Sequence, residues 1–223
     1  MGVIVVTGGF GTLGRAVAAE LGARGHKVAV VDIAPAPEGS SAALALGGVD
    51  LAEEAAVEAA YARVADALGP IDGLVNVAGG FVWEPVASGT LDSWDRMYRM
   101  NLRTATVSTR AVLPHLSKAG GAIVNIGAAG AVQPAMGMAP YAASKAGVRA
   151  LTESLAEEFR GKGVRVNAVL PTIIDTPVNR ADMPDADTSG WVKPEAAAKV
   201  IAFLLSDEAG AITGACIPLS LAG

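Results

Sequence analysis

Tyr141 and Lys145 lie four residues apart in the apolar segment APYAASKAGVRALTESLAEE, residues 139–158. On a helix spanning 141–160 their side chains would share one face, one turn apart. A free tyrosine has a pKa near 10, which is too high for easy proton transfer at neutral pH. An ammonium one turn away favours the phenolate and lowers that pKa. The pair could therefore transfer protons, and a buried tyrosine beside a lysine stem on apolar surface is the structural alternative.

A glycine-rich turn, TGGFGTLG at 7–14, joins an expected strand at 3–7 to an expected helix at 12–24. Glycine permits positive φ and lets backbone N–H groups approach a pyrophosphate closely. The dipole of the following helix adds to the attraction for an anion. This turn at the first strand-to-helix connection predicts a dinucleotide cradle made by Gly8, Gly9, Gly11 and Gly14.

Asp32 ends the second expected strand, 27–32, about 20 residues after the glycine turn. Its carboxylate would accept hydrogen bonds from an adenosine ribose and repel a 2′-phosphate. This favours NAD(H) over NADP(H) as the cofactor. The structural alternative is a turn-forming residue before Pro35.

Apolar runs without alternation recur along the chain and are typical of strands covered on both faces. Helical segments of about 12 residues or more separate most of them, which predicts right-handed crossovers and a parallel sheet. A short helix or turn is expected just before 47–51, and the irregular stretch 171–193 is long enough to be functional. The expected strands are 3–7, 27–32, 71–80, 121–127, 164–171 and 215–221. The expected helices are 12–24, 52–68, 91–118, 141–160 and 194–205.

Composition limits the possible functions. The 223 residues are 52 % apolar and 17 % charged, so a sizeable core is expected. A net charge of −5 without a basic run argues against nucleic acid and anionic membranes as partners. The single cysteine, Cys216, excludes an internal disulfide and fits a reducing compartment. His26 and His115 have no second ligand nearby, so no metal is predicted, and the absence of a signal peptide or membrane span predicts a cytoplasmic protein.

Six segments occur in the order and spacing of the short-chain dehydrogenase/reductase family, which the sequence resembles over its whole length. They are TGGFGTLG (7–14), VDL (49–51), NVAGG (76–80), MNL (100–102), YAASK (141–145) and LPTIIDT (170–176). The resemblance implies an α/β fold: a single Rossmann-type domain over 1–223, doubly wound, with about seven parallel strands and helices on both faces. It also implies an NAD(P)-dependent oxidoreductase.

The resemblance assigns roles to residues. Tyr141 would be the general acid in reduction, Lys145 would hold the nicotinamide ribose, and Asn101 would complete a water-linked proton path. Thr176 would hold the nicotinamide carboxamide, or serve only as a turn residue before Pro177. The expected cofactor-binding residues are Gly8, Gly9, Gly11, Thr12, Leu13, Gly14, Asp32, Asp50, Leu51, Asn76, Ala78, Gly79, Tyr141, Lys145, Pro171, Ile174 and Thr176. Of these, Asn76 is also expected to brace neighbouring strands.

Ala128 stands where the family has a serine, 13 residues before the tyrosine. Losing one such hydrogen-bond donor costs an enzyme that relies on it about 3–4 kcal/mol of transition-state stabilisation. The substrate could need no second donor, Gln133 or Thr172 could replace it, or the chain could bind cofactor and catalyse poorly.

Three segments resemble dihydropteridine reductases more closely: VAGG (77–80), 127–148 and 170–191. That subgroup is NADH-dependent and reduces quinonoid dihydropterin. The resemblance implies an activated C=N or quinonoid acceptor as the substrate. The alternatives are a general carbonyl reductase or alcohol dehydrogenase, and a non-catalytic sensor that binds NAD(H).

The remaining expectations concern the mouth of the site and the assembly. Asp175 and Arg180 could pair with polar substrate edges or be solvated loop charges. The helices at 91–118 and 141–160 carry surplus apolar surface, and the family commonly buries these helices in a homodimer or homotetramer. Five residues could stack on a flat substrate or simply pack a lid: Trp83, Met136, Met138, Met183 and Trp191.

Overall fold

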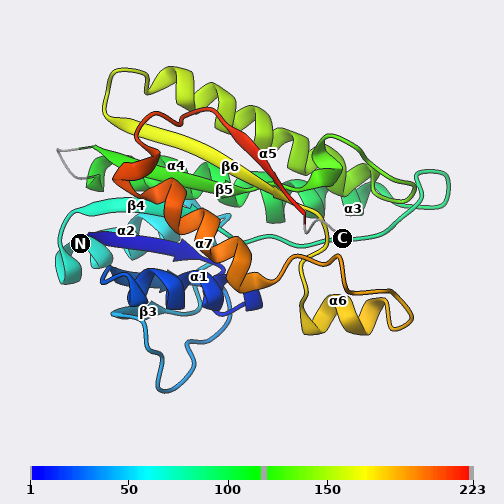
Figure 1. The fold of residues 1–223 in the computed structure, drawn as a ribbon, viewed down its shortest axis with the longest axis horizontal. Helices are drawn as coiled ribbons and strands as arrows, with labels where there is room; N and C mark the ends of the chain where they lie inside the picture. Colours follow the sequence, from blue (N-terminus) through cyan, green and yellow to red (C-terminus); the bar gives the residue numbers. More distant parts are fainter. Residues whose placement is uncertain (1, 117–119, 221–223) are drawn as a thin grey trace.

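The computed structural model of the protein describes residues 2–116 and 120–220. Within these residues seven strands form one parallel sheet in the order β3-β2-β1-β4-β5-β6-β7 (Figure 1). This is the doubly wound Rossmann-type arrangement that the sequence predicts. The strands are β1 Val3–Thr7, β2 Lys27–Val31, β3 Leu44–Leu46, β4 Ile71–Asn76, β5 Gly121–Ile126, β6 Val164–Pro171 and β7 Cys216–Leu219.

Helices cover both faces of the sheet because the central strands are apolar on both sides. In β1, Ile4 and Val6 point into the core under α1 and α7, whereas Val3 and Val5 point into the core under α2 and α4. Figure 1 shows α1 and α7 on one side of the sheet and α4 and α5 on the other. The helices are α1 Thr12–Ala23, α2 Glu54–Leu68, α3 Leu91–Met97, α4 Thr104–Val112, α5 Ala139–Glu158, α6 Pro177–Asp182 and α7 Pro194–Leu205.

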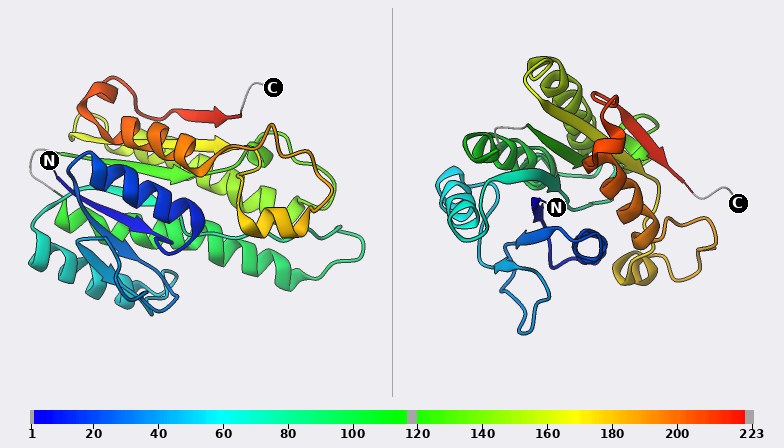
Figure 2. Two further views of the ribbon diagram at one scale, coloured as in Figure 1. Left: turned by 60° about the horizontal axis from the view of Figure 1, so that its bottom comes forward. Right: turned by 60° about the vertical axis from the view of Figure 1, so that its left-hand side comes forward.

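The carboxyl ends of the strands all face one edge of the molecule, since every strand pair is parallel. Short α6 projects from this edge, beyond the arrowheads of the strands (Figure 2). From β1 the chain builds the sheet first in one direction, through β2 and β3, and then in the other, from β4 to β7. The switch point therefore lies between β1 and β4. In open α/β sheets ligands bind at such a switch point.

Four predicted elements need correction. The short helix or turn expected before 47–51 is wrong, because 44–46 forms the edge strand β3. The strand expected over 71–80 ends at Asn76, where the chain leaves the sheet. The helix expected over 91–118 is divided by a π-helix at Tyr98–Arg103 and ends in a 3-10 turn at Leu113–His115. The loop 171–193 contains α6.

The ends of two predicted elements lie outside the described residues: 117–118 of the long helix and 221 of the last strand. In the part of the chain that is described, no helix is long and apolar enough to span a membrane.

Candidate active site

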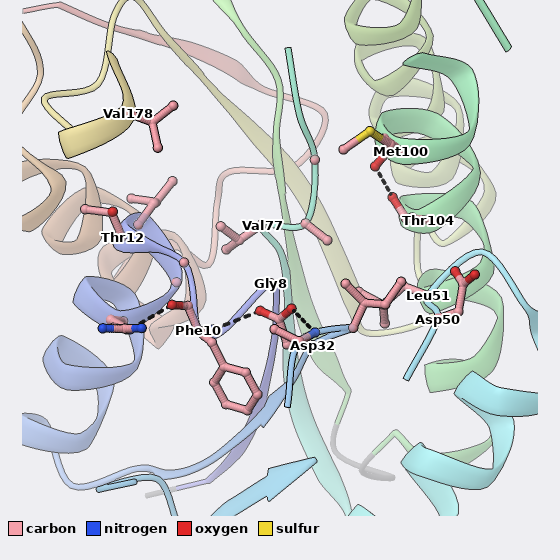
Figure 3. Close-up of a pocket in the computed structure, with 18 of the residues that line it drawn as sticks. Gly8, Phe10, Thr12, Asp32, Asp50, Leu51, Val77, Met100, Thr104 and Val178 are labelled. Carbon is pink, nitrogen blue, oxygen red and sulfur yellow. Dashed lines mark hydrogen bonds between the residues drawn. The ribbon is translucent and has the colours of Figure 1, made fainter. Parts of the chain in front are cut away.

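A cavity of about 730 Å³ opens at the switch point between β1 and β4. Figure 3 shows its walls, with Gly8 and Phe10 facing Asp32, and Met100 and Thr104 on the opposite side. The predicted residues that line it are Gly8, Gly11, Thr12, Leu13, Gly14, Asp32, Asp50, Leu51, Ala78, Gly79 and Thr176. Sequence reasoning missed the neighbours that complete the wall, namely Phe10, Arg15, Ile33, Ala34, Pro35, Pro37, Ala52, Val77, Arg99, Met100, Thr104 and Val178.

The glycine turn is shaped by close backbone contacts. Gly8 has φ +62°, and a Cβ on it would lie 2.9 Å from the Ala78 backbone. A Cβ on Gly14 would lie 2.1 Å from the Gly8 carbonyl oxygen, so α1 starts directly against the turn. Gly11 precedes α1 without a capping side chain, which leaves the first N–H groups of the helix free for an anion. The cradle therefore fits a pyrophosphate.

The Asp32 carboxylate is fixed by two backbone amides. The Phe10 N–H donates to its Oδ2 at 2.9 Å and the Ala34 N–H donates to its Oδ1 at 3.0 Å (Figure 3). Asp32 lies on the cavity wall beside the glycine turn, as the ribose-binding interpretation requires.

Two arginines from the π-helix region hold the loop that follows β3. The Arg99 guanidinium donates to Asp50 and to Glu53, each at 2.8 Å, and Arg103 donates to the Ala52 carbonyl at 2.8 Å. The Ala52 amide and the Arg99 guanidinium hold the pKa of Asp50 below its ordinary value. Asp50 therefore presents a charged carboxylate at the end of the cavity away from α6.

The predicted catalytic residues come together behind Gly79. The Lys145 ammonium, only 5 % exposed, donates to the Ile126 carbonyl at 2.7 Å, at the carboxyl end of β5. A Cβ on Gly79 would lie 2.6 Å from Asn101 Oδ1 and 3.3 Å from Lys145 Nζ. Because Gly79 also lines the cavity, Asn101 and Lys145 adjoin the cavity without lining it, and Tyr141 lies one turn of α5 from Lys145.

Asn101 fixes the turn of α5 that carries the tyrosine. Its Oδ1 accepts from the Gly80 N–H at 2.9 Å, and its Nδ2 donates to the Gly80 carbonyl and to Ser144 Oγ, each at 3.0 Å. Ser144 in turn donates to the Tyr141 carbonyl at 2.7 Å. The π-helix aims this amide inward, so Asn101 positions α5; its expected part in a proton path stays a prediction.

Burial raises the pKa of Tyr141 to about 12 and lowers the pKa of Lys145 to about 8. Loss of hydration disfavours the phenolate and the ammonium alike. The expected lowering of the phenol pKa by its lysine neighbour is therefore wrong for this structure, because burial alone determines the shift of the phenol pKa and moves it upward. Tyr141 consequently keeps its proton at neutral pH, which suits a proton donor.

Asn76 does not line the cavity, and the structure gives it the bracing role that the sequence also predicts. It is 4 % exposed and donates to Thr109 and Asn125 at 3.2 and 2.8 Å, so it braces β4 against β5 and α4. Gly9, Pro171 and Ile174 also lie off the wall: Gly9 packs on Val30, Pro171 pairs with Leu219, and Ile174 bridges to Val192.

Thr176 is a capping residue in the structure, and its expected contact with the nicotinamide carboxamide stays a prediction. It lines the cavity, and its Oγ1 accepts from the Asn179 N–H at 3.1 Å, which caps α6. Asp175 pairs with Arg180 and Lys193, so these loop charges satisfy one another. Trp191 is 4 % exposed and is therefore a packing residue, whereas Trp83 and Met136 are 55 % and 78 % exposed.

Ala128 is buried two residues after β5 and supplies no hydroxyl beside Tyr141. Gln133 and Thr172, its two possible replacements, are exposed. Across the described ranges no cluster of three or more histidine, cysteine, aspartate or glutamate side chains is arranged to hold a metal ion.

A glycine cradle at the switch point, next to a protonated phenol and a buried ammonium, defines a dinucleotide-dependent oxidoreductase. The comparison with protein families agrees: the model described as short chain dehydrogenase matches residues 2–187. The chain belongs to the short-chain dehydrogenase/reductase family and is an NAD(P)-dependent oxidoreductase.

Three relatives illustrate the match. The chain is 37 % identical to cis-4-hydroxycyclohexanecarboxylate dehydrogenase of Sinomonas cyclohexanicum, covering 96 % of this chain and 93 % of the relative. It is 32 % identical to meso-2,3-butanediol dehydrogenase of Serratia marcescens, covering 97 % and 92 %. The crystal structure of 3-ketoacyl-(acyl-carrier-protein) reductase from Brucella melitensis complexed with NADH superimposes with a TM-score of 0.85 at 29 % identity, covering 98 % and 96 %.

Proposed function

We propose that the protein interconverts a ketone and a secondary alcohol with NAD(H). The observation that carries the proposal is that Tyr141, protonated at neutral pH, lies one turn of α5 from Lys145, whose ammonium lies behind the cavity-lining Gly79. The names of the two dehydrogenase relatives describe the oxidation of alcohols, which supports this chemistry over an activated C=N acceptor. The test is NADH consumption with a panel of simple ketones, imines and quinonoid dihydropterin.

In the reducing direction a bound nicotinamide nucleotide supplies hydride to the carbonyl carbon. Tyr141 gives its proton to the carbonyl oxygen, so the product is the neutral alcohol. The Lys145 ammonium compensates the phenolate that remains until a proton from solvent restores the phenol. Asn101 and Ser144 hold the first turn of α5 so that the phenol keeps its place.

NAD(H) is the proposed cofactor because of Asp32. Its carboxylate is held on the cavity wall by the Phe10 and Ala34 amides, where it would accept from ribose hydroxyls and repel a 2′-phosphate. A preference for NADPH over NADH in binding titrations would contradict this assignment.

The pH dependence of reduction follows from the two shifted groups. We expect kcat/KM to stay level through neutral pH and to fall as pH rises through about 8, where Lys145 loses its charge. The Tyr141 proton persists to about pH 12, so it does not cause this fall. Lys145→Arg keeps the charge at all these pH values and should remove the fall from whatever activity remains. A wild-type profile that stays level to about pH 10, the ordinary lysine range, would contradict the assignment.

An activated acceptor such as quinonoid dihydropterin is the second candidate, and Ala128 favours it. A substrate already primed for hydride needs no second donor at its oxygen or nitrogen, so a buried methyl at this position is tolerable. Faster turnover of dihydropterin than of any ketone in the panel would establish this candidate. NADH binding without turnover of any compound would favour the non-catalytic sensor.

Ala128→Ser is expected to raise kcat/KM for simple ketones by about tenfold or more, because one donor to a developing oxyanion contributes about 10²–10³ where an enzyme relies on it. The measurement compares ketone reduction by the variant and the wild type at equal NADH saturation. Ala129→Ser, in the 3-10 turn that follows and outside the linings of the cavity and the adjoining groove, is the matched control. Unchanged ketone turnover in an Ala128→Ser protein that still binds NADH would show that the missing hydroxyl does not limit this substrate class.

A homodimer or homotetramer through α3, α4 and α5 is also proposed. Leu91, Trp94 and Tyr98, spaced three and four residues apart, leave exposed apolar surface along α3 and the start of the π-helix that a second subunit could cover. Light scattering of the purified protein measures the subunit number.

A further inference from the structure

Phe81 contacts the catalytic tyrosine. Its ring meets the ring of Tyr141 edge to face, with centroids 4.9 Å apart and an angle of 83° between the planes. Phe81 follows directly on Gly80, which Asn101 holds from both sides through the Gly80 N–H and carbonyl. The backbone directly before Phe81 is therefore held in place, with the Phe81 ring against Tyr141.

The Phe81 side chain is 51 % exposed although it packs on Tyr141. Part of its surface stabilises the phenol, and the rest is open to a ligand. A carbonyl oxygen that hydrogen-bonds to the Tyr141 hydroxyl brings the groups on its carbonyl carbon within a few ångströms of the phenol ring. Those groups then come within reach of Phe81 as well.

The surface around this pair is apolar. Trp83 is held over Gly137, where a Cβ would lie 2.4 Å from the indole nitrogen, and that nitrogen donates to the Met136 carbonyl at 3.1 Å. A Cβ on Gly130 would lie 3.9 Å from Tyr141 Cε1. Gly130 also lines an adjoining groove of about 780 Å³ whose lining residues are alanine, glycine, proline, valine and methionine.

The nearest acidic group in this segment is already engaged. Glu84 accepts from the Thr90 N–H and the Ser93 hydroxyl, and both bonds lower its pKa. No basic residue lines the described groove, so it offers no partner for a carboxylate, sulfonate or phosphate on a substrate.

We infer that Phe81 is a specificity-determining residue, and that its open surface binds an uncharged cyclic or aromatic group attached to the reacting carbonyl. The inference rests on the proposed function and deepens it by naming a substrate class. Aromatic side chains bury large area and prefer offset or edge-to-face partners, so a flat ring gains most from this contact. A small acyclic ketone gains little from it.

Phe81→Ala tests the inference through kcat/KM for acetophenone and cyclohexanone against 2-butanone. We expect a loss of about tenfold with each ring-bearing ketone, mainly through KM, and a change below about twofold with 2-butanone. Phe81→Tyr should retain ring selectivity. Phe203→Ala, which removes a 37 % exposed phenylalanine from α7, should leave kcat/KM unchanged for all three ketones. NADH affinity, measured by fluorescence, should be unchanged in every variant.

Two results would overturn the inference while leaving the proposed function in place. An equal loss with all three ketones would mean that Phe81 only supports Tyr141, and no loss with any would mean that the ring is not contacted. If wild-type protein that binds NADH reduces none of the ketones, the proposed function fails first, and the inference fails with it.

Discussion

Replacing Tyr141 by phenylalanine is expected to lower kcat for carbonyl reduction by about 10²–10⁴, the usual contribution of a positioned general acid. Burial raises the pKa of this phenol to about 12, so the proton is present at every working pH. Phenylalanine keeps the ring that packs on Phe81 but has no proton to give. The variant should therefore fold normally and bind NADH as before, and its loss should appear in kcat.

Steady-state NADH oxidation measures the loss, and fluorescence titration with NADH checks the unchanged affinity. Tyr98→Phe is the matched control, because Tyr98 is 51 % exposed at the start of the π-helix and has no part in the reaction centre. Full turnover in Tyr141→Phe would mean that the tyrosine is structural and that another group, or water, donates the proton.

The parts of the site that depend on local backbone chemistry could be predicted from the sequence. Three signals can each be recognised from a few neighbouring residues. They are the glycine turn, Asp32 directly after β2, and the spacing of Tyr141 and Lys145. The structure confirms the fold that these segments imply, and it places Asp32 on the cavity wall.

Features that depend on tertiary packing could not be predicted in this way. Strand β3 has three residues, of which only Leu46 is buried, so it carries no periodic signal and forms because β2 offers an unpaired edge. The pKa of Tyr141 moves upward because residues distant in sequence exclude water from it. The contact of Phe81 with Tyr141 joins residues 60 positions apart, and no sequence motif predicts it.

The sequence identifies Asn101 as a site residue but does not predict its structural role. The motif identifies this residue. In the structure its side chain makes two hydrogen bonds to Gly80, in the loop after β4, and one to Ser144 on α5, so it links that loop to the helix. Asn101 lies within the π-helix and is buried, at 1 % exposed. Positioning of the tyrosine is thus a property of two helices and one loop acting together.

Gly14→Ala is expected to weaken NADH binding by about 10–100-fold. The added Cβ would lie 2.1 Å from the Gly8 carbonyl oxygen, a backbone atom that can yield only if the whole cradle moves. Overpacking of this kind costs about 1–3 kcal/mol, and here the cost falls on the geometry that presents N–H groups to the pyrophosphate. Fluorescence titration with NADH measures the affinity, and thermal unfolding without cofactor shows how much of the cost the free protein bears.

Gly22→Ala in the same helix is the matched control, because a Cβ there meets nothing within 4 Å. It should leave NADH affinity unchanged and stabilise α1 by about 0.5–1 kcal/mol, since alanine loses less backbone entropy than glycine in a helix. The contrast separates a steric effect at the cradle from a general effect of substituting helical glycine. Wild-type affinity in Gly14→Ala would mean that the turn adapts and that the pyrophosphate is held elsewhere, which would remove the cofactor from its assigned place beside Tyr141.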